Sequence, residues 1–515
     1  MRISLPAAFL CATALLLSSN ASATSTNNWV GYNGSYPGDR YSTLTQINRS
    51  NVANLHAVCV FQFGELGPAQ TAPVIANGVM YVTSEQTTYA LDATTCKPRW
   101  KNTYVNTSVK SGIANRGVAL LDGKLFRGTP DSHLIAIDAA TGHTLWDVQV
   151  SDSTDGSNTV AAPLAWDGKV FIGIAGSEDG VKGKIMAFSA TDGKLLWTFD
   201  AIASGDDPGA GTWGNASATA TGGGGTWSSF GLDAATGTLF VPIGNPGPDF
   251  SADYRPGANL YTSSIVALDA GTGKLRWYYQ LVAHDYHDWD AAAPPALYRG
   301  ANGKPMMSFA GKSGILFTID YATHALISKV PVTTIVDADK PFTTEGTHFC
   351  PGTLGGVEWN GPAYSPHDKR VYVNAIDWCS TVRLGEVRYV RGTAFLGSGN
   401  GMGVKDAQGG TGWLTAVDPL TGKIAWRYHA PALMVAAVTP TAGGVLFTGE
   451  TTGEFDAFDS SNGNLLYRFN TGGSVAGGIA TYAVGGKQYV TAVSGNQSRT
   501  SVKGGGAPSI FIFSL

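Results

Sequence analysis

One pattern of apolar and polar positions recurs along the chain: an alternating apolar strand, the turn D-x-x-T-G, and a second strand that often ends in Trp. Asp opens such a turn through side-chain-to-backbone hydrogen bonds, and Gly adopts the positive φ that closes it. Alternating apolar residues on both sides predict two antiparallel strands, and the terminal Trp is large enough to pack between neighbouring sheets. The clearest copies are Ile135–Trp146, Ile265–Trp277 and Leu414–Trp426, and the looser copies are Tyr89–Trp100, Met186–Trp197, Phe317–Ile327 and Phe455–Tyr467.

These seven hairpins predict an all-β repeat protein whose two chain ends meet. Asn54–Phe63 resembles an eighth outer strand without a partner, and the last strand, Ile510–Leu515, can supply one. Pairing the ends would close a ring and remove exposed sheet edges. The turns at Asp233–Gly237 and Ser365–Lys369 fit inner strands of long repeats. We therefore predict an eight-bladed β-propeller with tryptophan-type blade repeats over residues 24–515, with seven blades as the alternative count.

Composition agrees with many short strands joined by tight turns. The chain has 515 residues, 43% apolar and 14% charged, with 67 Gly and 13 Trp. A single domain usually has roughly 100–200 residues, but repeat architectures exceed that range. The net charge of −4 gives no support for nucleic-acid binding, which usually shows a basic surface. We also expect no membrane span, because the apolar stretches are too short.

The first 23 residues have the features of a secretory signal peptide. Arg2 supplies the positive start, Pro6–Leu17 the apolar core, and Ala21-Ser22-Ala23 an A-x-A cleavage site. The sequence therefore predicts a signal peptide at residues 1–23 and an exported mature protein.

Four cysteines lie outside this segment, and an even count in an exported chain predicts two disulfides. We pair them in sequence order, as Cys59–Cys96 and Cys350–Cys379. No C-x-x-C-H motif occurs, so the chain carries no site for covalent haem.

Acidic residues are most closely spaced between Tyr278 and Leu297, where Asp285, Asp288 and Asp290 fall within six residues. Carboxylates at this density repel one another unless a positive group lies between them. In an extended chain Asp288 and Asp290 would point to one face, where their oxygens could bind a hard cation. For an isolated D-x-D, a solvated acidic turn is the alternative interpretation.

Three other loops carry unusual residues. Gly176–Gly183 places Glu178 in a glycine-rich turn after an apolar strand, Gly222–Gly225 precede Trp227, and Asn245 follows another strand. Each of these loops taken alone is compatible with an ordinary turn.

Together these segments resemble the PQQ-dependent (quinoprotein) alcohol dehydrogenases, in the type I form without a cytochrome c domain. The similarity runs from about Trp29 to the C-terminus and includes NNWVGYNGSYPGDRYSTLTQINRSNVANL, SEDGVKG, GNPGPDFSADYRPGANLYTSSIVALDAGTGKLRWYYQ and HDYHDWD. The region around Cys350 and Cys379 also resembles a disulfide region of that family. The resemblance implies that residues 24–515 form a PQQ-dependent dehydrogenase propeller.

The resemblance also implies roles for single residues. It makes Glu178, Asn245 and Asp288 metal ligands, and Asp288 the catalytic base as well. For the cofactor it implies Trp227 as the stacking residue and Arg116 and Lys312 as cationic partners. It also implies that Gly176 and Ser177, in the loop before Glu178, bind the cofactor. The residue types agree, since hard oxygen donors suit Ca²⁺ or a lanthanide better than Zn²⁺.

Asp290 matters for the choice of metal. An acidic residue there resembles lanthanide-dependent methanol dehydrogenases, in which it adds a ligand. The same loop also resembles the membrane glucose dehydrogenases, which need no lanthanide, and we favour Ca²⁺ over a lanthanide.

Four positions depart from the family pattern. Lys110-Ser111 replaces a pair of adjacent cysteines, and Glu358, Gln70 and Met434 replace Asn, Glu and a second Trp at the cofactor. These changes concern substrate range and PQQ affinity more than reaction type.

We therefore expect a periplasmic enzyme that oxidises an alcohol to an aldehyde or ketone by hydride transfer to PQQ. Without haem of its own it would pass electrons to a separate soluble cytochrome c or similar acceptor. The alternatives are a PQQ enzyme for a sugar or a polymeric or secondary alcohol, and a non-catalytic propeller scaffold that shares only the repeats. A scaffold has no reason to keep Glu178, Asn245, Asp288 and Trp227 together.

Overall fold

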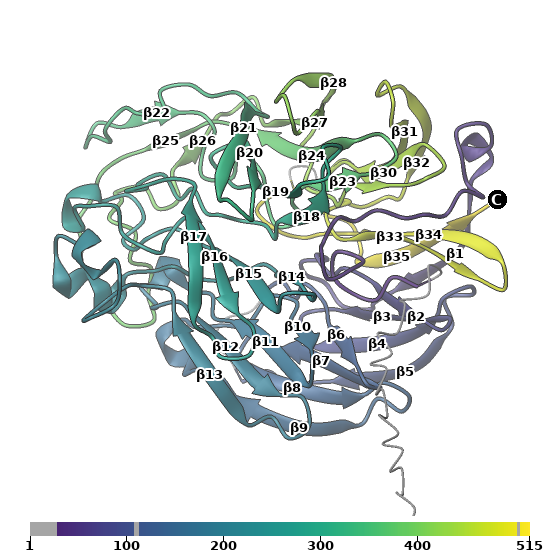
Figure 1. Cartoon of the computed structure of the whole chain (residues 1–515), viewed down its shortest axis with the longest axis horizontal. Helices are drawn as coiled ribbons and strands as arrows, with labels where there is room; N and C mark the ends of the chain where they lie inside the picture. Colours follow the sequence, from purple (N-terminus) through teal and green to yellow (C-terminus); the bar gives the residue numbers. More distant parts are fainter. Residues whose placement is uncertain (1–27, 108–112, 502–504) are drawn as a thin grey trace, which may run out of the picture.

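The computed structural model describes residues 28–107, 113–501 and 505–515. The predicted signal peptide, Met1–Ala23, and the Lys110-Ser111 pair lie outside these ranges. The described residues form eight four-stranded antiparallel sheets, one three-stranded sheet and six short 3₁₀ helices. The prediction of an all-β protein is confirmed (Figure 1).

Up to residue 280, consecutive strands form four of the sheets, with four strands in each. They consist of β2 (Val74–Ala76), β3 (Val79–Thr83), β4 (Thr87–Asp92) and β5 (Pro98–Thr103); β6 (Ala119–Leu121), β7 (Lys124–Gly128), β8 (His133–Asp138) and β9 (Thr144–Gln149); β10 (Leu164–Trp166), β11 (Lys169–Gly173), β12 (Lys184–Ser189) and β13 (Leu195–Asp200); and β14 (Gly231–Asp233), β15 (Thr238–Ile243), β16 (Ser264–Asp269) and β17 (Leu275–Gln280).

The next three four-stranded sheets also follow chain order, and the last one joins both chain ends. They consist of β18 (Ala296–Arg299), β19 (Pro305–Ala310), β20 (Ile315–Asp320) and β21 (Ala325–Pro331); β23 (Ala363–Ser365), β24 (Arg370–Asp377), β27 (Thr411–Val417) and β28 (Ile424–Ala430); β29 (Thr439–Pro440), β30 (Val445–Gly449), β31 (Glu454–Asp459) and β32 (Leu465–Asn470); and β33 (Ile479–Val484), β34 (Lys487–Ser494), β35 (Ser509–Ser514) and β1 (His56–Gln62).

The remaining elements are short. The three-stranded sheet contains β22 (Thr347–Phe349), β25 (Ser380–Val382) and β26 (Val404–Lys405). The 3₁₀ helices are η1 (Val52–Asn54), η2 (Ser153–Asp155), η3 (Ser177–Asp179), η4 (Ala210–Thr212), η5 (Ala216–Thr221) and η6 (Ala252–Tyr254). No helix in the described ranges is long and apolar enough to cross a membrane.

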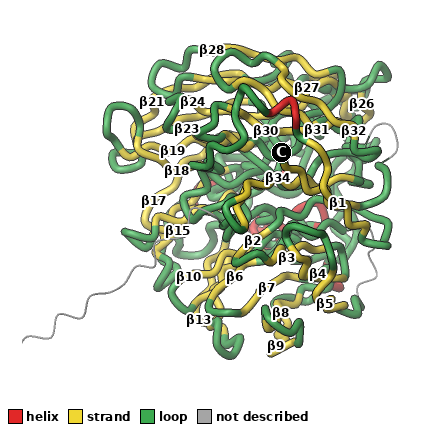
Figure 2. The backbone as a smooth tube through the Cα atoms, turned by 90° about the vertical axis from the view of Figure 1, so that its right-hand side faces the viewer, coloured by secondary structure: helices red, strands yellow, loops and turns green. Residues whose placement is uncertain are grey.

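The two chain ends pair as predicted. Strand β1 runs antiparallel to β35, with His56 opposite Ser514 and Gln62 opposite Ser509, and Figure 2 shows β1, β34 and the C-terminus side by side. The Cys59–Cys96 disulfide ties β1 to the turn after β4. The closing sheet is therefore joined covalently to the sheet that contains β2–β5.

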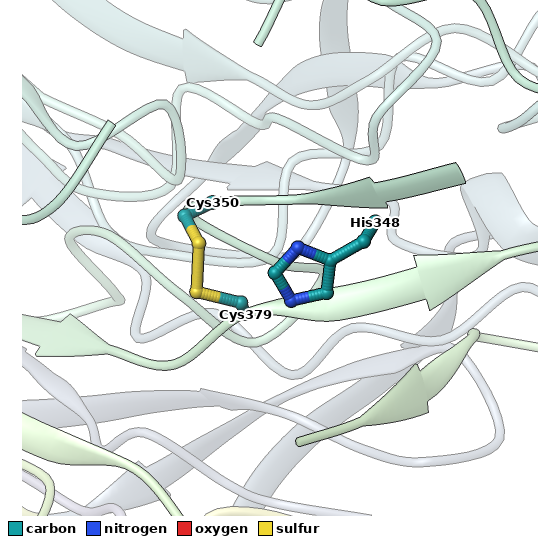
Figure 3. Close-up of side chains that lie close together, drawn as sticks. All are labelled: His348, Cys350 and Cys379. Atoms are coloured by element: carbon teal, nitrogen blue, oxygen red, sulfur yellow. A yellow bond between two sulfur atoms is a disulfide. The ribbon is translucent and has the colours of Figure 1, made fainter. Parts of the chain in front are cut away.

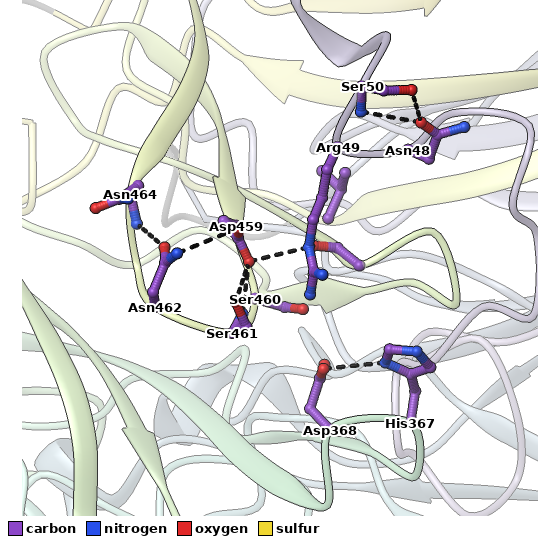
Figure 4. Close-up of polar contacts among 12 residues, drawn as sticks. Asn48, Arg49, Ser50, His367, Asp368, Asp459, Ser460, Ser461, Asn462 and Asn464 are labelled. Carbon is purple, nitrogen blue, oxygen red and sulfur yellow. Dashed lines mark hydrogen bonds and ion pairs between the residues drawn. The ribbon is translucent and has the colours of Figure 1, made fainter.

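A salt bridge adds to this closure from the segment before β1. Arg49 Nε lies 3.0 Å from Asp459 Oδ1 and donates to the Gly444 carbonyl at 3.1 Å. Asp459 also accepts from the backbone and hydroxyl of Ser461, as Figure 4 shows. The N-terminal segment is thus held against the β29–β32 sheet.

Each four-stranded sheet packs on two neighbours through hydrophobic clusters, and these contacts form a closed cycle (Figure 1). Phe171 and Leu239, for example, join the β10–β13 sheet to the β14–β17 sheet. Met80 and Ile510 join the β2–β5 sheet to the closing sheet. We call this arrangement of eight sheets the ring.

The Trp residues that end the repeats pack between neighbouring sheets, as the sequence predicts, and form hydrogen bonds to the next sheet. Trp100 donates its indole N–H to the Ala139 carbonyl at 3.1 Å, and Trp197 does the same to Ala270 at 3.1 Å. A Cβ on Gly142, in the turn of the next sheet, would lie 2.7 Å from the Trp100 ring. The turn glycine therefore provides both the positive φ, here +78°, and the flat surface on which the indole rests.

Candidate functional site

The residues that the sequence singles out line one cavity of about 540 Å³. Such a volume lies within the usual range for small-molecule sites. The lining includes all nine predicted site residues, namely Arg116, Gly176, Ser177, Glu178, Trp227, Asn245, Asp288, Asp290 and Lys312. Residues more than a hundred positions apart in sequence therefore share one chamber.

Loops at the strand ends of neighbouring sheets supply the polar residues. Glu178 lies in η3, shortly after β11, and Asn245 follows β15. Asp288 and Asp290 lie in the connection from β17 to β18, and Lys312 lies in the tight turn between β19 and β20. Each side chain is held by a loop that begins and ends in a strand, which fixes its position.

Lys312 lies between the two aspartates of the acidic stretch. Its Nζ is 3.1 Å from Asp288 Oδ2 and 2.7 Å from Asp290 Oδ2, and all three side chains are buried. Burial alone would lower the pKa of Lys312, but Asp288 and Asp290 raise it well above its usual value. Lys312 is therefore charged and satisfies one oxygen of each carboxylate.

Several oxygens at the site have no hydrogen-bond partner in the described part of the chain. They include Asp288 Oδ1 and Asn245 Oδ1, each on a buried side chain. Burial raises the pKa of Asp288 well above its usual value, and the nearby carboxylates of Asp290, Asp249 and Glu178 raise it further. Asp288 also has a φ of +65°, a strained conformation of the kind that clusters at functional sites. Oxygens left free in this way suit a hard cation.

Asp249 belongs to the same acidic group, although the sequence analysis did not single it out. Its side chain is fully buried, and neither carboxylate oxygen forms a hydrogen bond to the described residues. Burial raises its pKa well above the usual value, and repulsion from Glu178 and Asp290 adds to this effect. Four carboxylates thus act on one another at this site, with Lys312 among them.

The loop before Glu178 depends on small residues. Gly176 has a φ of +125°, and a Cβ there would lie 2.9 Å from the Gly156 carbonyl oxygen. Ser177 Oγ accepts a hydrogen bond from the Gly225 backbone N–H at 2.7 Å. Gly176 and Ser177 therefore position Glu178 and tie its loop to the glycine-rich segment before Trp227. Direct contact of either residue with a cofactor stays a prediction.

Arg116 lies between two indole rings at the cavity wall. Its Cζ is 4.8 Å from the Trp227 ring centroid and 5.3 Å from the Trp359 ring centroid. Nη1 donates to the Trp227 carbonyl at 2.8 Å, while Nε has no acceptor in the described chain. Trp359 lines the cavity and was missed in the sequence, because only the fold brings it beside Trp227.

Of the residues that depart from the family pattern, some line the cavity and one does not. Glu358 and Gln70 line the cavity, and burial raises the pKa of Glu358 to about 7. Met434 packs in the hydrophobic cluster between two sheets and is not among the cavity residues. Met434 therefore does not line the cavity, whereas Trp359 adds an aromatic surface to the lining, and an effect of Met434 on the cofactor stays a prediction. Arg499 is a further cation at the cavity that the sequence analysis missed.

The Asp285 carboxylate holds the backbone of the acidic stretch in place. It accepts backbone N–H bonds from His287 at 3.1 Å and Trp289 at 2.9 Å. The His287 ring stacks on Trp289, with centroids 4.1 Å apart. Trp289 donates its indole N–H to the Pro351 carbonyl at 3.1 Å, so the segment next to the second disulfide holds the residue between Asp288 and Asp290.

The second disulfide, Cys350–Cys379, also forms as predicted. His348 lies beside its sulfurs (Figure 3), but both sulfurs are used in the S–S bond and cannot act as thiolate ligands. His348 Nε2 instead lies 3.1 Å from Asp406 Oδ1. This group is therefore a structural cross-link beside the site and not a metal centre.

Comparison with known proteins decides the family. The model of a family described as PQQ, Glucose/ethanol/alcohol dehydrogenase, beta-propeller domain, matches residues 29–336 and 333–490. The chain belongs to this family. The PQQ family model spans the loops that carry Glu178, Asn245, Asp288 and Lys312, and the all-β ring agrees with the propeller that the family description names.

Relatives and solved structures of this PQQ family support the same assignment. The chain is 31% identical to quinoprotein alcohol dehydrogenase PedH of Pseudomonas putida, over 89% of this chain and 84% of that protein. It is 30% identical to a lanthanide-dependent methanol dehydrogenase of Methylacidiphilum fumariolicum, over 91% and 84%. Among solved structures, a europium-containing methanol dehydrogenase superposes with a TM-score of 0.87 at 27% identity, over 96% of this chain and 99% of that one.

Proposed function

We propose that this protein is a PQQ- and metal-dependent dehydrogenase that oxidises an alcohol to an aldehyde or ketone. The observation that carries the proposal is the convergence of Glu178, Asn245, Asp288 and Lys312 in one cavity beside Trp227. Free oxygens and an aromatic wall in one chamber suit a metal and a planar cofactor, which a scaffold protein would not need. The names of the relatives, a quinoprotein alcohol dehydrogenase among them, support the same reaction.

The residues present fit PQQ, which is a planar quinone with three carboxylates. Trp227 and Trp359 offer flat faces, and Arg116, with a free Nε, can form a forked contact to a carboxylate. Lys312 Nζ lies 5.6 Å from the Trp227 ring centroid, so a cation flanks the same aromatic surface. We propose that these residues, with Gly176 and Ser177 shaping the adjacent loop, bind the cofactor.

The donor set likewise fits a hard metal ion. We propose Glu178, Asn245, Asp288 and Asp290 as its ligands, because all four present oxygen. Asp290 Oδ1 already accepts the Asn245 N–H at 2.8 Å, so it would act through its other oxygen, which now faces Lys312. Ca²⁺ or a lanthanide satisfies this chemistry, and the excess of carboxylates over Lys312 provides the compensating negative charge.

Asp288 is the proposed general base. Lys312 holds its Oδ2, so the free Oδ1 is the atom that would take the hydroxyl proton of the alcohol. Held by these residues, PQQ would supply the hydride acceptor for the alcohol carbon and the metal ion a Lewis acid. Asp288 is fully buried, which would limit the access of water to the substrate hydroxyl.

Three further features belong to the proposal. We propose one blade for each four-stranded sheet, which gives an eight-bladed propeller, supported by the closed cycle of eight clusters. We place the protein in the periplasm, supported by two disulfides, which persist in oxidising compartments. A separate soluble cytochrome c or similar acceptor would take the electrons.

Reconstitution tests the proposal. Purified protein is loaded with PQQ plus Ca²⁺ or La³⁺, passed through gel filtration, and assayed by dye-linked turnover over a panel of alcohols. We expect retained quinone absorbance, metal-dependent turnover, and a loss of about 10²–10⁴-fold in kcat for Asp288→Asn. Asp147→Asn, a partly exposed carboxylate on β9, serves as the matched control and should leave kcat unchanged.

Two results would contradict the proposal. Absence of both turnover and retained quinone with either metal would favour a non-catalytic scaffold. Normal turnover of Asp288→Asn would show that another carboxylate is the base.

A further inference from the structure

The arginine at position 40 differs from the other fully buried arginines. Arg40, Arg127 and Arg255 have the largest side chains that are fully buried in the described ranges. Arg127 donates to the carbonyls of Ser84 and Glu85, at 3.3 and 2.7 Å, and to Thr88 Oγ1 at 3.2 Å. For Arg127 the carboxylates of the chain add electrostatic compensation.

Arg255 is satisfied in the same way. It donates to the Pro248 carbonyl at 2.9 Å, to the Asp249 carbonyl at 3.1 Å and to Asn259 Oδ1 at 3.0 Å. The Asp285 and Asp249 carboxylates act on it electrostatically. The chain therefore surrounds two of the three fully buried guanidinium groups in the described ranges with its own acceptors and carboxylates.

Arg40 has no carboxylate to compensate it within the described chain, and the only group that acts on it is the Tyr32 hydroxyl. Its Nε, Nη1 and Nη2 are all buried and all lack a hydrogen-bond acceptor. Its Cζ lies 5.4 Å from the centroid of the Tyr32 ring, and the Tyr32 hydroxyl donates instead to the Trp359 carbonyl and Asn360 Oδ1, each at 3.3 Å. No carboxylate is among the groups that act on Arg40 electrostatically.

The guanidinium is nevertheless charged at neutral pH. Burial lowers the pKa of Arg40 to about 10, and burial raises the pKa of Tyr32, so the tyrosine is neutral and cannot balance the charge. An isolated buried cation without hydrogen bonds is strongly unfavourable. Tyr32 is neutral, so the charge of the guanidinium has no counter-ion among the described residues.

The backbone keeps Arg40 in this position. The Pro37 carbonyl accepts from Leu297 at 2.8 Å and the Asp39 carbonyl accepts from Tyr364 at 2.9 Å, while the Ser42 N–H donates to the Pro440 carbonyl at 3.0 Å. These bonds run to the first strands of three successive sheets, β18, β23 and β29. Arg40 itself has a φ of +55°, a conformation that non-glycine residues adopt only when their surroundings impose it.

We propose that Arg40 forms a buried site for a small monovalent inorganic anion, of the size and charge of chloride, inside the ring. The planar guanidinium offers five N–H donors in a fixed arrangement. Water could accept some of these bonds but could not balance the charge, whereas a halide does both. The side chain is 1% exposed, so the anion would be enclosed by protein, where a compact ion needs less space than an oxyanion or an organic acid.

The anion site is separate from the cofactor cavity, although Tyr32 connects the two. Arg40 is not among the residues that line the cavity, whereas Trp359, whose carbonyl accepts from Tyr32, is. The inference rests on Arg40 and its surroundings, so it holds whether or not the proposed oxidation is correct.

Bromide is the probe, because its anomalous scattering distinguishes it from water. Crystals of the wild-type protein are grown or soaked in sodium bromide and measured at the bromine absorption edge. We expect a strong anomalous peak at hydrogen-bonding distance from the Arg40 guanidinium, and none there in Arg40→Met. Ordered water alone around Arg40, with bromide only at the surface, would overturn the proposal.

Thermal unfolding provides a second measurement. In sodium bromide compared with sodium gluconate at equal ionic strength, the wild-type midpoint should rise by about 1 °C for each tenfold increase in bromide above its Kd. Arg40→Met should lose this dependence, and Arg49→Met, a partly exposed control, should keep it. Equal midpoints of the wild-type protein in the two salts at every concentration would also contradict the proposal.

Discussion

Replacing Lys312 with Met tests whether this lysine compensates the acidic group of the metal-free protein. The change removes the ammonium that lies 3.1 Å from Asp288 and 2.7 Å from Asp290 and keeps a side chain of similar length. Asp288 and Asp290 would then remain buried beside Glu178 and Asp249 without their nearest cation. We therefore expect the variant to be less stable than the wild-type protein in the absence of metal.

The expected size follows from the burial of all three partners. Breaking a buried ion pair by removing one partner costs about 3–5 kcal/mol, because the other charge stays buried. The entropy of unfolding is about 2.1 cal/mol/K per residue, or about 1 kcal/mol/K over 515 residues. The midpoint of thermal unfolding should therefore fall by about 3–5 °C.

The assay is calorimetry in excess EDTA, repeated after addition of Ca²⁺ or La³⁺. Because a bound cation would compensate the same carboxylates, we expect metal to raise the midpoint of Lys312→Met more than that of the wild-type protein. Lys304→Met is the matched control: Lys304 is 61% exposed, lies 3.6 Å from Asp320, and should change stability by less than about 1 kcal/mol. Equal metal-free midpoints for Lys312→Met and the wild-type protein would refute the reasoning.

Three other predictions concern the cofactor wall, the acidic group and the ring. Trp227→Ala should raise the Kd for PQQ by up to about tenfold, measured by quenching of protein fluorescence, since it removes one aromatic contact. Asp249→Asn should weaken Tb³⁺ binding roughly tenfold in a luminescence titration, because one nearby charge is lost; unchanged affinity would show that Asp249 does not contribute to metal binding. Gly463→Ala places a Cβ 2.5 Å from Trp426, whereas Gly472→Ala has the same φ of +78° and open space, so in urea unfolding Gly463→Ala should be less stable than Gly472→Ala by about 1–3 kcal/mol.

The repeat pattern predicted the sheets because its physics is local. A D-x-x-T-G turn fixes a hairpin with little help from the rest of the chain, and each of the seven predicted hairpins is present. Closure by Asn54–Phe63 and Ile510–Leu515 could also be predicted, because two unpaired apolar strands remained and only one pairing leaves no exposed edge. The two disulfides were predicted from the even number of cysteines, paired in sequence order, and both are present.

The site was predictable only where the chemistry is visible in neighbouring residues. Asp288 and Asp290 stand out because they lie two positions apart, whereas the expected metal roles of Glu178 and Asn245 came only from resemblance. Trp359 went unnoticed because its place beside Arg116 depends on how distant loops converge. The same limit explains why Met434 was expected at the cofactor although it packs in a hydrophobic cluster and does not line the cavity.

The errors and omissions share one physical cause, which is that burial turns ordinary residues into functional ones. Asp249 is one more acidic residue in a turn until the ring removes water from both of its oxygens. Arg40 is likewise a common surface residue type until three sheets fix its backbone and leave its guanidinium without an acceptor in the described chain. The ring therefore encloses an excess of negative charge around Lys312 and an uncompensated positive charge at Arg40. The side chains described around each site do not relieve its imbalance, which is why we propose a ligand of opposite sign at each.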